Sequence, residues 1–301
     1  MINTHFSLQR GALAMIRLRL SLALSYEVNE PGSNFIFNIH AAHTNRQVVV
    51  DESLVVNQQV PLTVETDPTT GNRYLRLSAA TGPLQIFYTA SVDLTHYMAA
   101  PEQIAEVPVA RLPAQVLGYI YPSRYCQSDR LYRLAMREFG QRQQGYGRVQ
   151  AIRDWVAQRI TYAKNISDSN SSAIDTLIET AGVCRDFAHL MIALCRASNI
   201  PARFTTGINY GVDPVYGPLD FHAYVEVYLV GGWYLFDPSG TAIPMGLVRF
   251  GTGRDAADVA FATIFGEVGS SPPVINIEAI AGADGLLVMP QLVRSALSTD
   301  G

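Results

Sequence analysis

The chain has 301 residues, more than one ordinary hydrophobic core accommodates, which predicts two domains. Apolar residues make up 48% and charged residues 16% of it, a composition that supports well-buried cores and excludes general disorder. The 22 basic and 26 acidic side chains give a net charge of −4 without a Lys/Arg-rich run, which excludes nucleic acid as an expected partner.

The N-terminal third is predicted to form strands. Residues 1–14 show no periodicity and are expected to be a disordered extension, whereas from Ile16 leucines alternate with polar residues, as in a half-buried strand. Arg17 and Arg19 exclude a membrane span or signal-peptide core there, so we expect a cytoplasmic protein without a membrane partner. Residues 15–110 are therefore predicted to form an all-β, sandwich-like domain, with further strands at 35–41, 47–50, 74–77 and 84–92.

A proline-rich linker follows, because Pro101, Pro108, Pro113 and Pro122 forbid a continuous helix. The second domain is predicted to span residues 111–301, with its core at about 145–240. Its pattern indicates helices first and antiparallel strands after, hence an α+β chain. The expected helices are 128–139, 146–163 and 184–198, and the expected strands are 202–208, 221–230 and 233–236.

Cys184 begins the third of these helices. A thiol attacks a carbonyl as the thiolate, a form that the positive end of a helix dipole favours. The free N–H groups of the first helical turn can also stabilise the oxyanion that forms when an amide is attacked. Cys184 is therefore a candidate nucleophile, whereas a cysteine at a helix start with no partner motif is more often a small buried residue.

His222 and Asp237 are candidates for the base and for the group that orients it. His222 opens one predicted strand and Asp237 closes the next. A hairpin centred near residues 229–230 would set them opposite each other, whereas a two-residue turn at residues 231–232 would displace them by about four residues, roughly 13 Å. The earlier turn, or a bulge, is the expectation.

The segments around these residues resemble the core of the transglutaminase-like superfamily over about residues 145 to 240. The leading β-rich region is similar, more loosely, to the N-terminal domain of the bacterial transglutaminase-like cysteine proteases. The matching segments are Gly182-Val-Cys-Arg-Asp-Phe-Ala-His-Leu190, Gly211, Phe221-His-Ala-Tyr-Val-Glu226 and Trp233-Tyr-Leu-Phe-Asp-Pro238, preceded by Ile160-Thr-Tyr162 and Ala173-Ile-Asp-Thr-Leu177.

The resemblance implies a papain-like Cys184–His222–Asp237 triad, with the cysteine on a helix and its partners on adjacent antiparallel strands. It implies a thiol-dependent amide hydrolase or acyltransferase that acts on peptide or protein amides through a Cys184 thioester, without a cofactor. By the same analogy Tyr162 is a possible oxyanion donor. Tyr224, where many members carry Trp, is expected to shape the pocket.

Two alternatives stay open at this point. One is a crosslinking or deamidating transglutaminase, although no sequence feature identifies an amine-binding site. The other is a non-catalytic binding module on the same scaffold. The sequence does not define the oligomeric state. The triad residues could formally ligate zinc, but the chain has no HExxH, CxxC or EF-hand pattern, so no metal site is expected.

The remaining chemistry-bearing residues near Cys184 have structural interpretations. Cys126 and Cys195 are expected to be core thiols, free in a reducing compartment. His189 lies roughly 140° around the helix from Cys184 and should not face it. Asp186, in the first helical turn, is expected to cap the helix.

Overall fold

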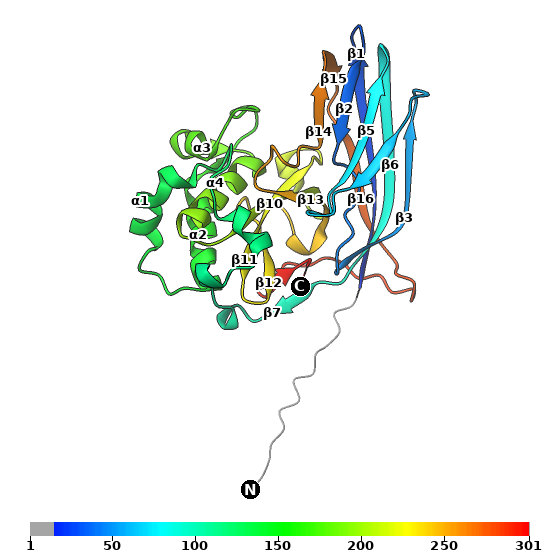
Figure 1. Ribbon diagram of the computed structural model, residues 1–301. Helices are drawn as coiled ribbons and strands as arrows, with labels where there is room; N and C mark the ends of the chain where they lie inside the picture. The colour runs from blue at the N-terminus through cyan, green and yellow to red at the C-terminus, as the bar shows by residue number, and fades with distance from the viewer. Residues whose placement is uncertain (1–14, 301) are drawn as a thin grey trace.

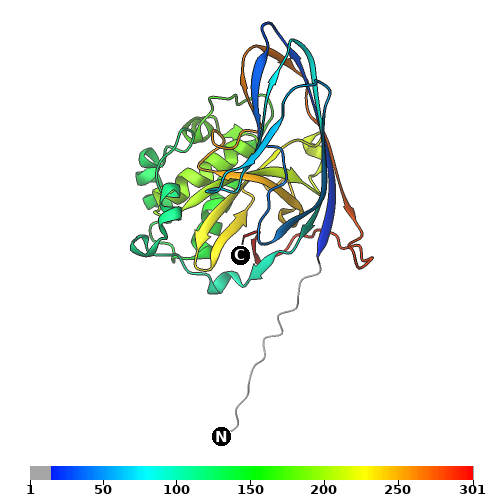
Figure 2. The ribbon, with the colours of Figure 1, turned by 45° about the vertical axis from the view of Figure 1, so that its right-hand side comes forward.

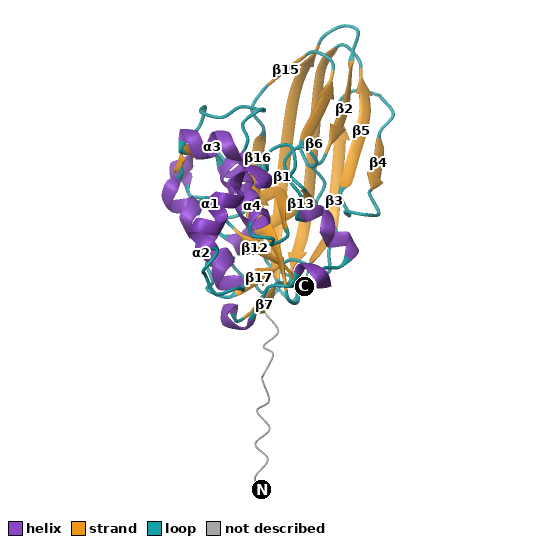
Figure 3. Cartoon of the chain, turned by 60° about the vertical axis from the view of Figure 1, so that its left-hand side comes forward, coloured by secondary structure: helices purple, strands orange, loops and turns teal. Residues whose placement is uncertain are grey.

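The chain folds into a β-rich body and a mixed helix-and-sheet body that pack side by side (Figure 1). This computed structural model describes residues 15–300, so the extension predicted at 1–14 lies outside the described residues. The helices gather on one side of the molecule and the long strands on the other (Figure 3). Within the described residues, no helix is both long and apolar enough to cross a membrane.

The β-rich body contains two antiparallel sheets. Its first strand confirms the predicted alternation, because the even-numbered leucines from Leu18 to Leu24 are buried. One sheet has the order β15-β1-β6-β3, with β16 also paired to β1, and the other has the order β14-β2-β5-β4. The strands are β1 (Ile16–Val28), β2 (Ser33–Phe37), β3 (Gln47–Val56), β4 (Thr63–Thr66), β5 (Arg73–Ala79), β6 (Gly82–Leu94), β14 (Ala262–Phe265), β15 (Val268–Ser270) and β16 (Val274–Ile280).

Three strands of these sheets come from the distant C-terminal part of the chain. In β14, Ile264 pairs with Phe35 of β2, and in β16, Ala279 pairs with Leu18 of β1. Residues 262–280 fall inside the range predicted for the second domain, yet they complete the sheets of the first. Strand pairing depends on long-range register, which local sequence patterns do not encode.

Among residues 15–300, the mixed body consists of four α-helices on a six-stranded sheet of order β13-β10-β11-β12-β17-β7. The helices are α1 (Ser128–Phe139), α2 (Tyr146–Arg159), α3 (Ala173–Glu179) and α4 (Cys184–Ala197). The strands are β7 (Tyr97–Ala99), β10 (Ala202–Asn209), β11 (His222–Leu229), β12 (Gly232–Phe236), β13 (Leu247–Gly253) and β17 (Ala296–Ser298). The α+β prediction is confirmed.

Short elements connect this framework. The second predicted helix, 146–163, ends early at Arg159, because Thr161 and Tyr162 form a small parallel pair with the residues before Cys184. The pair is β8 (Thr161–Tyr162) with β9 (Ala181–Gly182). The short 3₁₀ helices are η1 (Pro101–Gln103), η2 (Val109–Arg111), η3 (Ala114–Tyr119), η4 (Pro214–Tyr216) and η5 (Pro244–Gly246).

The six-stranded sheet is the central layer of the molecule. One face, which includes Val225 and Phe236, shares an apolar core with α4 and the other helices. The opposite face, which includes Tyr224 and Leu235, shares a core with the leucines of β1. The yellow strands accordingly lie between the green helices and the blue β-rich body (Figure 2). This layering fixes the start of α4 against the end of the central sheet.

Candidate active site

Cys184 is the first residue of α4, and a buried carboxylate holds the entry to that helix. Asp186 accepts hydrogen bonds from the Val183 N–H, at 2.9 Å, and from the Ser167 hydroxyl. A side chain at Gly182 would come within 2.7 Å of Asp186, so only glycine fits before the turn. Asp186 thus caps the helix, as its position suggested, and the Cys184 sulfur lies 3.9 Å from the Phe221 carbonyl oxygen.

The β11–β12 hairpin brings His222 and Asp237 together. Its register pairs Val225 with Phe236 and Leu229 with Gly232, so the two-residue turn is 230–231. The expected earlier turn at 229–230, or a bulge, is therefore wrong, because the regular register places the turn one residue later. If the pairing continues by one residue, Asp237 lies opposite Tyr224. His222 is two residues before Tyr224 on the same strand, so it lies on the same face as Asp237, in the diagonal position. The Asp237 Oδ2 is 3.7 Å from the His222 Nε2, an ion-pair distance too long for a hydrogen bond.

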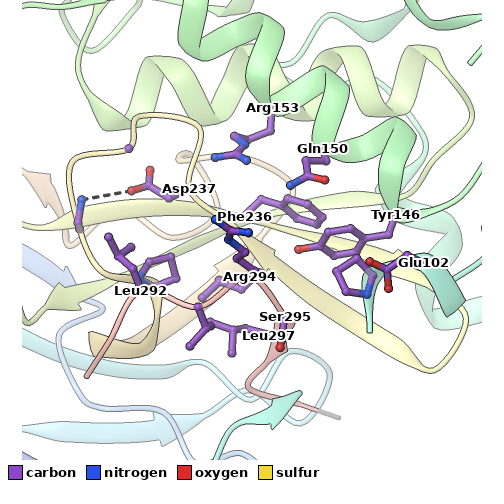
Figure 4. Close-up of a pocket in the computed structure, with 16 residues that line it drawn as sticks. Glu102, Tyr146, Gln150, Arg153, Phe236, Asp237, Leu292, Arg294, Ser295 and Leu297 are labelled. Carbon is purple, nitrogen blue, oxygen red and sulfur yellow. Dashed lines mark hydrogen bonds between the residues drawn. The ribbon is translucent and has the colours of Figure 1, made fainter. Parts of the chain in front are cut away.

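The Asp237 carboxylate is fixed by the turn that follows β12. Its Oδ1 accepts hydrogen bonds from the Ser239 N–H, at 2.9 Å, and from the Ser239 hydroxyl, at 2.6 Å. Its Oδ2 also accepts a long bond from the Ala242 N–H, at 3.4 Å, which is the dashed line in Figure 4. The carboxylate is therefore positioned independently of His222.

The electrostatics of the site favour a protonated His222. Burial opposes its protonation, but the adjacent Cys184 sulfur and the Asp237 carboxylate outweigh burial and raise the pKa of His222 to about 10. Burial alone would raise the pKa of Asp237, but its contacts with His222 and Ser239 hold that pKa below its ordinary value. An imidazolium between a sulfur and a carboxylate is the arrangement that activates a cysteine nucleophile.

Cys184 and His222 line one cavity of about 440 Å³. Much of its remaining wall is apolar and comes from Phe204, Phe221 and the segment 256–263. A substrate carbonyl in this cavity would meet the thiol and the first turn of α4, whose leading N–H groups have no partner within the helix. The cavity is therefore the candidate site of chemistry.

Asp237 also borders a second, larger cavity of about 640 Å³. Tyr146, Gln150 and Arg153 reach it from α2, and Arg294 reaches it from the segment before β17 (Figure 4). Neither Cys184 nor His222 lines it. Because it lacks the nucleophile, the larger cavity is not the candidate catalytic cleft.

The two predicted tyrosines lie near the site without lining the 440 Å³ cavity. The Tyr162 ring lies 4.9 Å from the Tyr216 ring, and burial, with the nearby Cys184 charge, raises the pKa of Tyr162 to about 12. Tyr224 is buried behind His222, with 4.6 Å between the ring centroids, and its hydroxyl donates to Asn209 at 2.6 Å. Tyr224 therefore packs against the histidine.

The residues for which the sequence predicted structural roles, Cys126, Asp186, His189 and Cys195, are fully buried. His189 accepts a hydrogen bond from the Ala256 N–H, at 3.2 Å, and burial lowers its pKa to about 3, so it is neutral. Burial raises the pKa of Cys126 to about 12 and that of Cys195 further. His189 thus anchors the segment 256–263, which forms one wall of the cavity. No pattern in the sequence indicated this role.

Other residues of the cavity were missed by sequence reasoning. Arg124, Tyr125 and the segment 256–263 line it together with Cys184. They lie about sixty residues before and seventy residues after the cysteine and carry no motif. Only the folded arrangement of α1, α4 and β14 brings them to the thiol.

Comparison with known proteins identifies both parts of the chain. Residues 133–238 match the family model described as "Transglutaminase-like superfamily", and residues 16–115 match "Bacterial transglutaminase, N-terminal domain". A crystal structure described as "a Putative Cysteine Protease from Cytophaga hutchinsonii" is 37% identical, with a TM-score of 0.87, over 95% of this chain and 98% of that one. An uncharacterized protein from Mycobacterium leprae is 31% identical over 153 residues. This match covers 49% of the present chain and half of that protein's length.

Proposed function

Because the chain belongs to the transglutaminase-like superfamily, we propose that it is a thiol-dependent amide hydrolase, acting on peptide or protein amides through a Cys184 thioester. The observation that supports this proposal is the convergence of three groups. The Cys184 thiol and the His222 imidazole line one cavity, and the Asp237 carboxylate lies 3.7 Å behind the imidazole.

The geometry supports an acyl-transfer sequence in two halves. The Cys184 thiolate attacks the amide carbon, and N–H groups of the first α4 turn face the developing oxyanion. His222 gives its proton to the nitrogen as the C–N bond breaks, so the amine leaves and a thioester remains. Water then attacks the thioester while His222 takes a proton from it, which returns the thiol and releases the acid.

Alkylation of the three thiols tests the activation of Cys184. Peptide-level mass spectrometry after iodoacetamide treatment at pH 6 should show Cys184 modified far faster than Cys126 and Cys195, which serve as internal controls because both are fully buried. In the His222→Ala variant the alkylation of Cys184 itself should become much slower, because the thiolate loses its imidazolium partner. Equal rates for the three thiols in the unchanged protein would contradict an activated nucleophile.

A second experiment separates hydrolysis from crosslinking. A glutamine-containing peptide is offered with a labelled primary amine, and released ammonia or peptide acid is measured together with amine incorporation. We expect water to capture most of the thioester, with Cys184→Ser inactive in both readouts. Incorporation that outruns hydrolysis at millimolar amine would assign the protein to transamidation.

A further inference from the structure

The catalytic cleft has a charge that differs in sign from that of the whole chain. The protein carries a net charge of −4, yet none of the described residues that line the 440 Å³ cavity is an aspartate or glutamate. The charged side chains in its wall are Arg124 and Arg185, whereas the imidazolium of His222 is balanced by the Cys184 sulfur and the Asp237 carboxylate that favour its protonation. The positive potential is thus local to the nucleophile.

The two arginines are not equally available. Arg185 donates to the carboxylate of Asp186, at 3.0 Å, and to the carbonyl oxygen of Asp168, at 2.6 Å, so its charge is committed to the start of α4. Arg124 is exposed just before α1, and within residues 15–300 it pairs with no carboxylate. Arg124 is therefore the cation of this wall that is free to bind a ligand.

Arg124 is held over a rigid platform. Its guanidinium lies 4.9 Å from the centre of the Tyr125 ring, and that ring stacks on the buried His189 at 4.9 Å. The Tyr125 hydroxyl donates to the Ser169 carbonyl at 2.6 Å, and its N–H donates to the Asp255 carboxylate at 2.9 Å. A guanidinium fixed over an aromatic ring keeps its N–H fork available for a planar anion.

The remaining wall defines what else the ligand must present. Phe221 and Phe261 stack at 4.4 Å between centroids, and Phe204 and Val259 complete an apolar surface. An anion such as free phosphate would leave this surface uncovered. A peptide segment that carries one carboxylate among apolar groups would use both the cation and the apolar wall.

We propose that Arg124 forms a carboxylate-binding subsite of the Cys184 cleft, so that the enzyme prefers amide substrates with a carboxylate close to the scissile bond. This inference rests on the proposed hydrolase function and names its substrate class. The carboxylate is either the side chain of an acidic residue or the C-terminal carboxylate of the substrate. Arg124 contacts the substrate and selects it, whereas the bond-breaking steps use Cys184 and His222.

A peptide set tests the subsite directly. Peptides with one cleavable amide carry Glu, Gln or Lys at each of the three positions on either side of it, and each is made with a free and an amidated C-terminus. We expect kcat/KM to be about three- to tenfold higher for Glu than for Gln at one position, mainly through KM, and the difference to shrink with added salt. If only the C-terminal carboxylate is recognised, the preference follows the free C-terminus instead.

Variants assign this preference to Arg124. Arg124→Gln should abolish it, Arg124→Lys should keep part of it, and Arg124→Glu should favour the Lys peptides. Arg133→Gln is the matched control, because Arg133 is exposed on α1, outside the cavity, and the same charge is lost. Preference that is unchanged in Arg124→Gln, or lost equally in Arg133→Gln, would overturn the proposal.

A binding readout separates the two proposals. The same peptides are tested for protection of Cys184 against iodoacetamide. Protection by acidic peptides that depends on Arg124, without turnover of any peptide, supports the subsite and refutes the hydrolase. Turnover of acidic and neutral peptides at equal rates, with equal protection, refutes the subsite and leaves the hydrolase standing.

Discussion

His222 is the residue whose protonation state controls the site. Its pKa of about 10 exceeds the ordinary value of 6.5, and the Cys184 sulfur contributes most to the increase, against the effect of burial. The imidazolium therefore stabilises the folded state fully below pH 6.5, and this contribution is lost as the pH rises through 10. Activity that needs the protonated ring should decline over the same alkaline range.

NMR titration of the His222 ring measures this directly. We expect the ring to titrate near pH 10 in the unchanged protein and at a clearly lower pH in Cys184→Ala, because the negative sulfur is removed. Asp237→Asn should lower the pKa by a smaller amount. A His222 ring that titrates near 6.5 in all three proteins would show that the sulfur and the carboxylate do not stabilise the imidazolium.

The contribution of Asp237 can be graded with two substitutions. Asp237→Asn keeps the bonding geometry but removes the charge, so kcat should fall by about ten- to ten-thousand-fold while substrate binding changes little. Ser239→Ala removes the 2.6 Å bond to Oδ1 and the hydroxyl's contact with Thr241 but keeps the bond from the Ser239 N–H, so its loss should be smaller. Steady-state kinetics would contradict an orienting role if Asp237→Asn raised KM alone.

Sequence spacing was sufficient to single out the three residues of the candidate triad, because each one lies in a motif next to a recognisable helix or strand. The register between His222 and Asp237 could not be derived, since the sequence offered turns at 229–230 and 231–232 and the structure has the turn at 230–231. Arg124 could not be found either, because an arginine before a helix has no distinguishing pattern. Its significance comes from Tyr125 and His189, which are neighbours only in the fold.

At the scale of single elements, the start of α4 depends on Asp186. Its carboxylate bonds the Val183 N–H and the Ser167 hydroxyl, and it is fully buried. Asp186→Asn should reduce the free energy of unfolding by about 1–2 kcal/mol, because one acceptor for the cap is lost. It should also slow the alkylation of Cys184, since the first turn positions that thiol.

Asp175 offers a matched control for this prediction. It caps α3 at the same helical position, where its carboxylate accepts from the Ser172 N–H at 2.9 Å, and it does not line the cavity. Asp175→Asn should cost less free energy in chemical denaturation, because Asp175 is exposed, and it should leave the Cys184 alkylation rate unchanged. Equal effects of both variants on that rate would mean that Asp186 acts only through stability.

Elements with a strong local period were predicted well. The alternation in β1, the helix Ser128–Phe139 and the helix that begins at Cys184 all follow from hydrophobic spacing and end signals. Nothing in the local sequence of residues 262–280 indicates which strands they pair with. Their pairing with β1 and β2 is fixed by the assembled sheets, so a domain division drawn along the sequence misses it.

At the scale of the whole molecule, a buried ion network joins the last residues to the central sheet. Glu226 of β11 pairs with Arg203 at 2.6 Å and with Arg249 at 3.3 Å, and both arginines also contact Asp300. Burial alone would raise the pKa of Asp300, but the two arginines lower it to about 2. Its contribution to stability is therefore present above pH 3.8 and lost as the pH falls through 2.

Glu226→Gln tests the network. It leaves two buried guanidinium groups short of a partner, so we expect a loss of about 3–5 kcal/mol in the free energy of unfolding. Asp93→Asn is the comparison, because Asp93 forms a half-buried pair with Arg17 at 2.6 Å in the β-rich body, and its loss should be smaller. Urea denaturation distinguishes them, and equal losses would mean that the network contributes no more than a single pair.

The return of residues 262–280 to β1 and β2 has a consequence for synthesis on the ribosome. The N-terminal strands emerge first, but the edges of β1 and β2 stay unpaired until the last sixth of the chain is made, and open edges promote aggregation. The N-terminal part of the β-rich body, expressed alone as residues 15–115 without the returning strands, should therefore aggregate. When coexpressed with residues 116–301, this fragment should assemble into a two-chain complex that elutes as one particle. A soluble, folded 15–115 fragment would show that the returning strands are dispensable.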